Sequence, residues 1–183
     1  FADAFYVSSL RLVGVNRAFP ISNTYPLFTV LSSLLLLGEQ VSWPMIVGAL
    51  LTLSGVYVVS RTKEEASQLD DSPVTSSHMV KGSLLALATA AIWGLTTVML
   101  SLGAEGINSA VANSVRVPVV AVLSTFAGAS RGKLPSLRCI DRHIALSLVL
   151  AGILGWGIGG TLYTASVQLA GPSKTAIISA TAP

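Results

Sequence analysis

Long apolar segments without charge follow one another along the chain, separated by short charged connections. Twenty-one uncharged residues lie between Arg17 and Glu39, and another 21 lie between Glu39 and Arg61. The next such segments, residues 82–104 and 143–173, are 23 and 31 residues long. A helix needs about 20 apolar residues to cross the hydrocarbon core of a bilayer. The pattern therefore predicts several membrane-spanning helices.

The apolar segments predict seven crossings, of which the first and last are partial. We expect them at residues 1–15, 18–37, 43–60, 82–102, 109–128, 144–169 and from about 173 onward. Runs such as LSSLLLLG do not alternate as barrel strands do, and a helix satisfies its own backbone groups in lipid. The predicted fold class is an all-α, polytopic membrane protein.

Composition supports this class and argues against others. Hydrophobic residues make up 52% and charged residues 10%, whereas a soluble domain carries about 25% charged residues. The net charge is +3, but the basic residues lie in the connections, which fits lipid head groups better than nucleic acid. The single Cys139 permits no intrachain disulfide, and His78 and His143 lie in connections without a partner at metal-ligand spacing. We expect no metal and no cofactor.

An internal repeat is the most informative feature of the sequence. A shift of 157 residues aligns FYVSSLRLVGVNRAFPISNTYP with LYTASVQLAGPSKTAIISATAP, with eight identities in 22 positions. The two copies lie five crossings apart, an odd number, so they are expected to point in opposite directions through the bilayer. Inverted repeats of this kind are typical of secondary transporters. The identical pairs are Tyr6/Tyr163, Ser9/Ser166, Leu12/Leu169, Gly14/Gly171, Ile21/Ile178, Ser22/Ser179, Thr24/Thr181 and Pro26/Pro183.

The repeat predicts the organisation of the chain. We expect residues 1–60 to be the C-terminal part of a first repeat, residues 61–80 a polar linker, and residues 81–183 the N-terminal part of a truncated second repeat. Because the sequence begins and ends within apolar segments, we expect it to belong to a longer protein of ten helices in two inverted five-helix repeats.

Several motifs resemble a known family. PLFTVLSSLLLLGEQ, GALLTLSGVYVVS and KGSLLALATAAIWGL follow one another in the order and spacing of the EamA-type transporters of the drug/metabolite transporter superfamily. Matching positions include Pro26, Glu39, Trp93 and Arg116. The resemblance implies ten helices in two inverted halves and transport of small polar metabolites, but it does not identify one substrate.

Candidate pathway residues follow from two aligned prolines. Pro26 has no N–H and leaves the carbonyl of Ser22 free, and Pro183 does the same for Ser179. Two alternatives stay open: the hydroxyls hydrogen-bond one helix to another, or the prolines only kink their helices. The candidates are Ser22, Thr24, Pro26, Trp93, Arg116, Tyr163, Ser179 and Pro183.

Other residues have structural alternatives. Arg116 is the only charge that we expect well inside a crossing, where it either attracts an anionic group, pairs with a carboxylate or snorkels to the membrane surface. We expect Glu39 to cap a helix junction at that surface. Trp93 and Tyr163 either border a cavity or anchor and pack their helices. Glycines at helical spacing predict close helix packing: Gly48, Gly55, Gly152, Gly155 and Gly159.

We therefore predict a permease, not an enzyme, that moves small polar metabolites by alternating access between two inverted repeats. Its expected location is the plasma membrane, and its expected partners are the lipid bilayer and a small-molecule substrate, without nucleic acid; a homodimer stays open. The alternative is a non-transporting membrane scaffold or a lipid-modifying membrane enzyme. An enzyme needs a cluster of His, Asp, Glu or Cys at one membrane surface, and the sequence indicates none.

Overall fold

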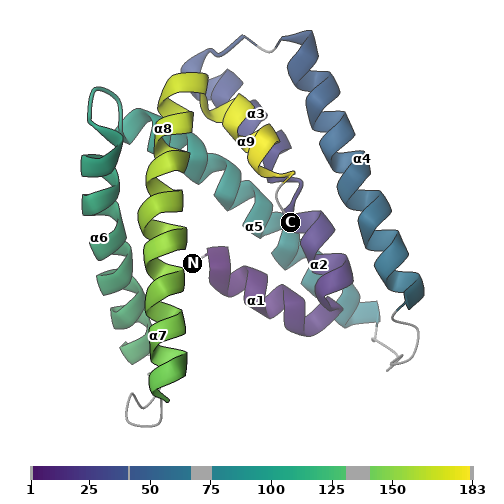
Figure 1. The fold of residues 1–183 in the computed structure, drawn as a ribbon. Helices are drawn as coiled ribbons and strands as arrows, with labels where there is room; N and C mark the ends of the chain where they lie inside the picture. The colour runs from purple at the N-terminus through teal and green to yellow at the C-terminus, as the bar shows by residue number, and fades with distance from the viewer. Residues whose placement is uncertain (1, 41, 67–75, 131–140, 182–183) are drawn as a thin grey trace. The chain divides into compact units, whose positions relative to one another are not determined.

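The computed structural model describes residues 2–40, 42–66, 76–130 and 141–181, and these ranges are helical without a strand (Figure 1). Cys139, Pro183 and residues 67–75 of the predicted linker lie outside them. The all-α prediction is confirmed. The helices are α1 (Ala2–Val13), α2 (Val15–Ser22), α3 (Tyr25–Leu37), α4 (Trp43–Ala66), α5 (Ser76–Gly103), α6 (Ser109–Ser130), α7 (Arg142–Ala151), the π-helix η2 (Gly152–Gly159), α8 (Gly160–Ala170) and α9 (Pro172–Ser179).

Four helical segments of the described chain are long and apolar enough to cross a membrane. They are Val15–Leu37, His78–Gly103, Ser109–Ala129 and Arg142–Ala170, and Trp43–Gly55 is a shorter apolar helix. Large apolar side chains cover their outer surfaces; Leu35 is 73% and Phe126 is 75% exposed. Exposed apolar surface of this extent indicates a lipid environment. The polytopic membrane class is confirmed.

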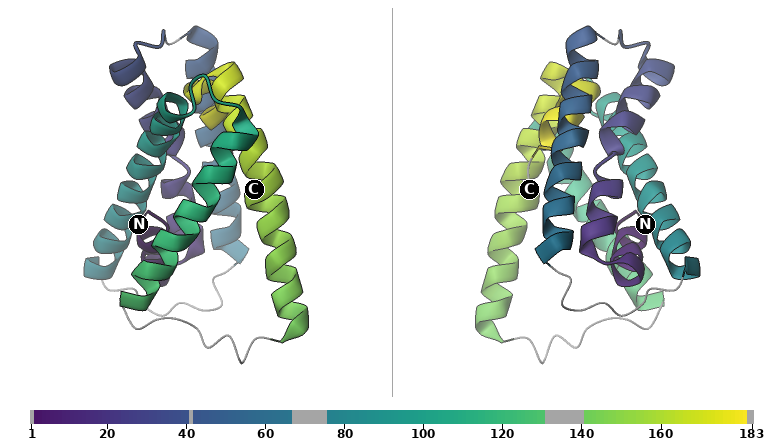
Figure 2. Two further views of the ribbon diagram at one scale, coloured as in Figure 1. Left: turned by 90° about the vertical axis from the view of Figure 1, so that its left-hand side faces the viewer. Right: turned by 90° about the vertical axis from the view of Figure 1, so that its right-hand side faces the viewer.

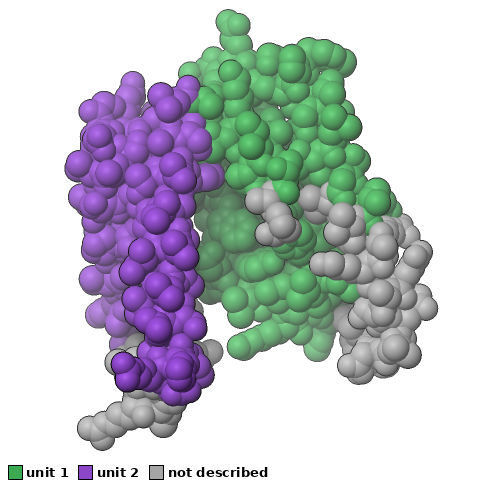
Figure 3. Space-filling view, viewed as in Figure 1, with its two compact units in different colours: residues 1–100, 170–183 green, residues 101–169 purple. Residues whose placement is uncertain are grey.

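The chain forms two compact units, which are described separately (Figure 3). Unit 1 contains residues 1–100 and 170–183, and unit 2 contains residues 101–169. Unit 1 thus brings the last described helix, α9, together with helices from the first half of the chain.

In unit 1, α9 packs against α3 and α4 (Figures 1 and 2). Met45 and Ala49 of α4 and Ile177 of α9 form a small apolar core, with Val30 of α3 partly buried against it. Gly48 faces the same contact, because a Cβ atom there would lie 3.4 Å from Ile177 Cγ2.

Two glycines of α5 allow it to approach α1 and α3 within unit 1. A Cβ atom on Gly94 would lie 2.7 Å from Phe28 Cβ and 2.8 Å from the backbone nitrogen of Thr29. At Gly82 a Cβ atom would collide with Val13, and Ser9 Oγ donates to the Gly82 carbonyl oxygen over 2.8 Å. At both glycines the helices approach too closely for a side chain, and the sequence did not single these positions out.

The crossing predicted at residues 18–37 is broken into two helices. Pro26 stands at the first turn of α3, where its missing N–H is tolerated. At the break, Asn23 Nδ2 donates to the Phe19 carbonyl over 3.0 Å, and Thr24 Oγ1 donates to the Ile21 carbonyl over 2.7 Å. These side-chain bonds add to the backbone bonds of Asn23 and Thr24 to the same two carbonyls, so they stabilise the end of α2.

One face of this crossing carries hydroxyl groups and is buried, whereas its leucine face is exposed. Ser22, Thr29 and Ser33 are at most 1% exposed, but Leu34 and Leu36 are about half exposed. The hydroxyl-bearing face therefore turns towards the protein, as a polar face of a membrane helix should.

Candidate functional site

The two aligned copies share an unusual backbone conformation. Gly14 has φ 75° and ψ 167° before α2, and Gly171 has φ 87° and ψ 158° before α9. Both values of φ fall in the region that favours glycine. Each of the two helices is eight residues long and begins directly after its glycine. The aligned glycines thus start equivalent helices in the two copies.

The two helices also end alike. Thr24 Oγ1 donates to the Ile21 carbonyl over 2.7 Å, and the aligned Thr181 Oγ1 donates to the Ile178 carbonyl over 2.6 Å. The backbone N–H groups of the same threonines reach the same carbonyls over 3.2 Å and 3.1 Å. Equal geometry at both ends is what two copies of one structural unit produce.

Within unit 1, α9 runs antiparallel to α3. At the start of α3, the Tyr25 hydroxyl lies 2.6 Å from Ser179 Oγ and donates to the Ala176 carbonyl over 3.2 Å, near the end of α9. Beyond the end of α3, Glu39 accepts a hydrogen bond from Ser173 in the first turn of α9. Because α2 and α3 form one crossing, α9 points against the crossing with which it aligns in sequence.

Glu39 lies at the N-terminus of α9. Its carboxylate accepts hydrogen bonds from the hydroxyls of Ser33 and Ser173, both of which are at most 1% exposed. A helix N-terminus carries partial positive charge, so a carboxylate is stabilised there. Gly171 leaves the space for this carboxylate, since a Cβ atom there would collide with Glu39 Oε1. The acid thus joins the α3–α4 connection to α9.

Ser22 lies at the break of the crossing and has an unsatisfied side chain. Its hydroxyl is buried and has no hydrogen-bond partner in the described part of the chain. Its aligned counterpart Ser179, by contrast, is bound to Tyr25 and to its own helix at Ala176. A buried unpaired hydroxyl beside an interrupted helix is a place where a polar ligand or water gains a hydrogen bond.

Trp93 is the centre of an aromatic cluster in unit 1. Its ring centroid lies 5.5 Å from that of Tyr6 on α1 and 6.2 Å from that of Tyr25 on α3, the latter pair edge-to-face. Trp93 Nε1 donates to Asp3 Oδ1 over 3.3 Å. The structure therefore groups Trp93 with Tyr6, Tyr25 and Asp3, none of which was among the predicted pathway residues.

Asp3 is a charged residue that lies against a membrane-spanning helix, and the place of Arg116 as the only charge well inside a crossing stays a prediction. Trp93 lies 15 residues from His78 and 10 from Gly103 in a membrane-spanning segment, which is about 22 Å and 15 Å along the helix axis. Because Asp3 is hydrogen-bonded to Trp93, its carboxylate lies beside the middle part of this apolar helix. The sequence did not indicate this contact, because the two residues lie 90 positions apart.

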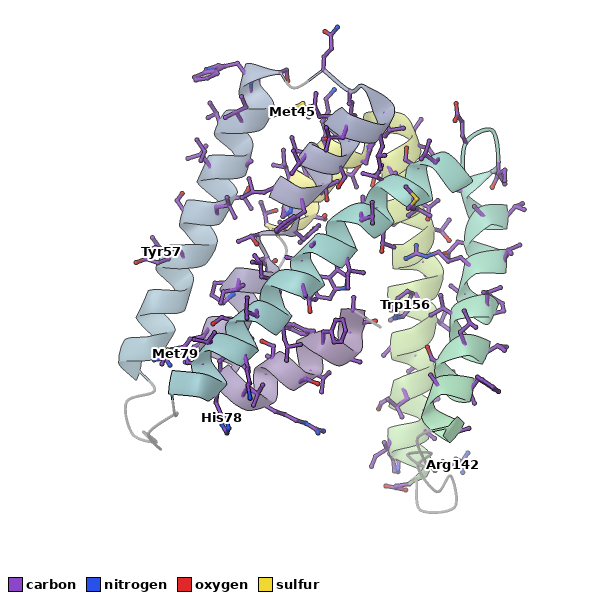
Figure 4. All side chains as sticks on the ribbon, turned by 180° about the vertical axis from the view of Figure 1, so that it is seen from behind. Met45, Tyr57, His78, Met79, Arg142 and Trp156 are labelled. Atoms are coloured by element: carbon purple, nitrogen blue, oxygen red, sulfur yellow. The ribbon has the colours of Figure 1, made fainter. Side chains whose placement is uncertain are left out.

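In unit 2, Arg116 lies over the ring of Trp156, with 5.8 Å between the guanidinium carbon and the ring centroid. Figure 4 labels Trp156 on the long helix formed by α7, η2 and α8. Stacking on an indole stabilises a cation by cation–π attraction. The structure places Arg116 against an aromatic ring.

Asn113, one turn before Arg116, binds the π-helical segment. Its Nδ2 donates to the carbonyls of Trp156 and Gly157 over 2.9 Å and 3.3 Å, and lies 3.1 Å from Thr161 Oγ1. A Cβ atom on Gly160 would lie 3.0 Å from Asn113 Oδ1. The predicted helix at 144–169 thus contains a π-helical turn whose carbonyls Asn113 binds, a feature that periodicity does not predict.

The remaining predicted residues fall in several places. Tyr163 is half-buried on α8 in unit 2, and Pro183 lies outside the described residues. His78 and His143 are exposed. At Gly55, Gly152 and Gly155 a Cβ atom would meet nothing within 4 Å, and at Gly159 it would meet only the carbonyl of Leu154 in the preceding turn. The role of these four glycines in packing stays a prediction.

Comparison with known proteins identifies the family. Residues 1–61 and 80–183 match the EamA-like transporter family, and the chain belongs to this family. A protein of Archaeoglobus fulgidus described as an uncharacterized transporter is 24% identical over 152 residues, covering 83% of this chain and 50% of the relative. The chain thus spans about half the length of this curated relative. No solved structure matches the chain significantly.

The described residues contain no group of three or more His, Cys, Asp or Glu side chains that could hold a metal ion. The unpaired hydroxyl of Ser22, the rings around Trp93 and the bond between Tyr25 and Ser179 make the broken α2–α3 crossing, the aromatic cluster and α9 the candidate functional site of unit 1.

Proposed function

We propose that the protein is a secondary transporter that moves a small polar solute across a membrane by alternating access between two inverted repeats. Residues 1–60 and 81–183 belong to the two repeats, and residues 61–80 link them. Membership of the EamA-like transporter family supports this proposal, as do the matched segments on either side of the linker. The plasma membrane is the proposed location.

The observation that carries the proposal is the interrupted crossing at Ser22. Irregular backbone at membrane depth is tolerated where it lines a cavity or is buried in protein, and transporters place such breaks at their substrate sites. Here the break leaves a buried hydroxyl unpaired. One turn further on, Tyr25 is bound to Ser179 of α9, a helix that runs in the opposite direction. A scaffold needs neither feature.

Cysteine accessibility tests the proposal. In a Cys139→Ser background, we expect Ser22→Cys and Ser179→Cys to react with a small water-soluble methanethiosulfonate reagent, because a substrate pathway admits water. Leu35→Cys on α3 is the matched control, since Leu35 is 73% exposed on the apolar face and is expected to face lipid. If Ser22→Cys is as unreactive as Leu35→Cys, the protein behaves as a scaffold and the proposal is wrong.

Replacing Arg116 by alanine is expected to reduce transport about tenfold while the protein still inserts, because the change removes a cation stacked on Trp156. Uptake into proteoliposomes, measured with a solute identified by a metabolite screen, gives the rate. Arg142→Ala, at the exposed start of α7, is the control. Equal rates for the two variants would make Arg116 a structural anchor.

A further inference from the structure

The carboxylate of Asp3 has an unusual environment for a charge in a membrane. It accepts a hydrogen bond from Trp93 Nε1 over 3.3 Å, close to the middle of the spanning segment His78–Gly103. Arg11, the basic residue of the same helix, lies eight positions away, about 12 Å along the axis. An ionised group inside a bilayer is costly unless a counter-charge or water compensates for it, so a carboxylate beside an apolar spanning helix points to a functional site.

The ring of Trp93, which binds this carboxylate, packs with aromatic rings from two other helices. Tyr6 of α1 and Tyr25 of α3 lie 5.5 Å and 6.2 Å from Trp93 of α5, measured between ring centroids. All three rings are only half-buried, and Asp3 is exposed. The face of an aromatic ring attracts a cation within about 6 Å of its centroid. The carboxylate of Asp3 and the faces of these rings both attract positive charge, and both repel anions.

Two hydroxyl groups, those of Tyr25 and Ser22, belong to the same broken crossing as the cluster. The Tyr25 hydroxyl is held by Ser179 and the Ala176 carbonyl of α9, so the ring of Tyr25 is oriented from the opposite helix. Ser22, one turn before Tyr25, keeps a buried hydroxyl without a partner in the described residues. This hydroxyl can form a hydrogen bond with a polar group of a ligand.

We propose that Asp3, Tyr6, Tyr25 and Trp93 form a binding site for a small organic cation that carries a substituted ammonium group. The rings offer apolar surface that suits an alkylated ammonium better than a hydrated metal ion, and the described residues contain no cluster of metal ligands. This inference rests on the proposed transport function and names the chemical class of its substrate.

Choline and its neutral isostere 3,3-dimethylbutan-1-ol test the proposal, because the isostere has the same shape with carbon in place of the charged nitrogen. The full-length protein in lipid nanodiscs is titrated with radiolabelled choline, and the isostere is added as a competitor. We expect choline to bind at least about 30-fold more tightly than the isostere, the difference that a desolvated cation–π contact supplies. Equal affinity for the two compounds would overturn the proposal.

Variants assign the binding to the cluster. Asp3→Asn is expected to weaken choline binding at least about tenfold, and Trp93→Leu about 30-fold. Asp141→Asn and Trp43→Leu are matched controls, since both residues are exposed and lie outside the cluster. If Trp93→Leu fails to fold, Trp93→Phe replaces it and is expected to show a smaller loss. Choline affinity unchanged in Asp3→Asn would overturn the assignment.

Transport is scored separately from binding. Choline binding that depends on Asp3, without movement of choline into proteoliposomes, would support the site and contradict the transport function. Movement of other solutes, with no choline binding that depends on Asp3, would support the transport function and overturn the cation site.

Discussion

Gly94→Ala is expected to destabilise the protein by about 3 kcal/mol, the upper end of what overpacking usually costs. The new Cβ atom would lie 2.7 Å from Phe28 Cβ, 2.8 Å from the Thr29 backbone nitrogen and 2.9 Å from the Phe28 carbonyl carbon. Two of these atoms belong to the backbone of α3 and cannot rotate away. The helices must therefore separate, which also disturbs the contact between Tyr25 and Trp93.

The free energy of unfolding, measured by SDS titration in mixed micelles, is the quantity to compare. Gly103→Ala, on the same helix, is the matched control because a Cβ atom there would meet nothing within 4 Å. We expect the control to change stability by less than about 0.5 kcal/mol. If Gly94→Ala is as stable as the control, α5 does not approach α3 as described.

Glu39→Ala is expected to destabilise the protein by a similar amount, about 3 kcal/mol, through two effects. It leaves the buried hydroxyls of Ser33 and Ser173 without their acceptor, and an unsatisfied buried polar group costs about 1–3 kcal/mol. It also removes a carboxylate from the N-terminus of α9, where negative charge is worth about 0.3–1 kcal/mol. Glu39→Gln keeps an acceptor oxygen and is expected to lose about half as much.

The same SDS titration measures this effect, and hydrogen exchange at the amides of α9 shows where the structure loosens. Glu105→Ala, an exposed acid between α5 and α6, is the control and is expected to behave like the wild type. We expect the amides of α9 to exchange faster in Glu39→Ala than in the wild type, and no such change in Glu105→Ala. Equal stability of Glu39→Ala and Glu105→Ala would contradict the role of Glu39 as a cap.

The spanning helices were predictable from sequence because charge is costly in lipid, so the uncharged segments between charged connections are at least one crossing long. The charged connections locate α4, α5 and α6 to within a few residues, apart from extensions of α4 and α5 into the charged linker. The aligned glycines 14 and 171 were also visible as a repeat, and the structure gives them the same backbone conformation.

The packing of the helices was not predictable, because a contact depends on which other helix lies against a given face of a helix. Gly94 and Gly155 both lie in apolar helices, yet only Gly94 faces another backbone at close range. Asp3 was missed for the same reason: its contact with Trp93 joins residues that lie 90 positions apart. The break at Asn23 and Thr24 depends on hydrogen bonds of particular side chains, which hydrophobic periodicity does not encode.

The central claim is that the two aligned copies cross the membrane in opposite directions. Arg17 and Lys174 are aligned near the start of α2 and of α9, and both are exposed. The bond between Glu39 and Ser173 places Lys174 at the far end of the crossing that Arg17 begins. Gln40, exposed beside Glu39, is a control for the Lys174 side.

Labelling with a membrane-impermeant maleimide tests this claim most directly, using single cysteines at 17, 40 and 174 in a Cys139→Ser background. Intact cells and inside-out vesicles expose opposite faces of the membrane. We expect positions 40 and 174 to react from one face and position 17 from the other. Reaction of positions 17 and 174 from the same face would contradict the inverted arrangement.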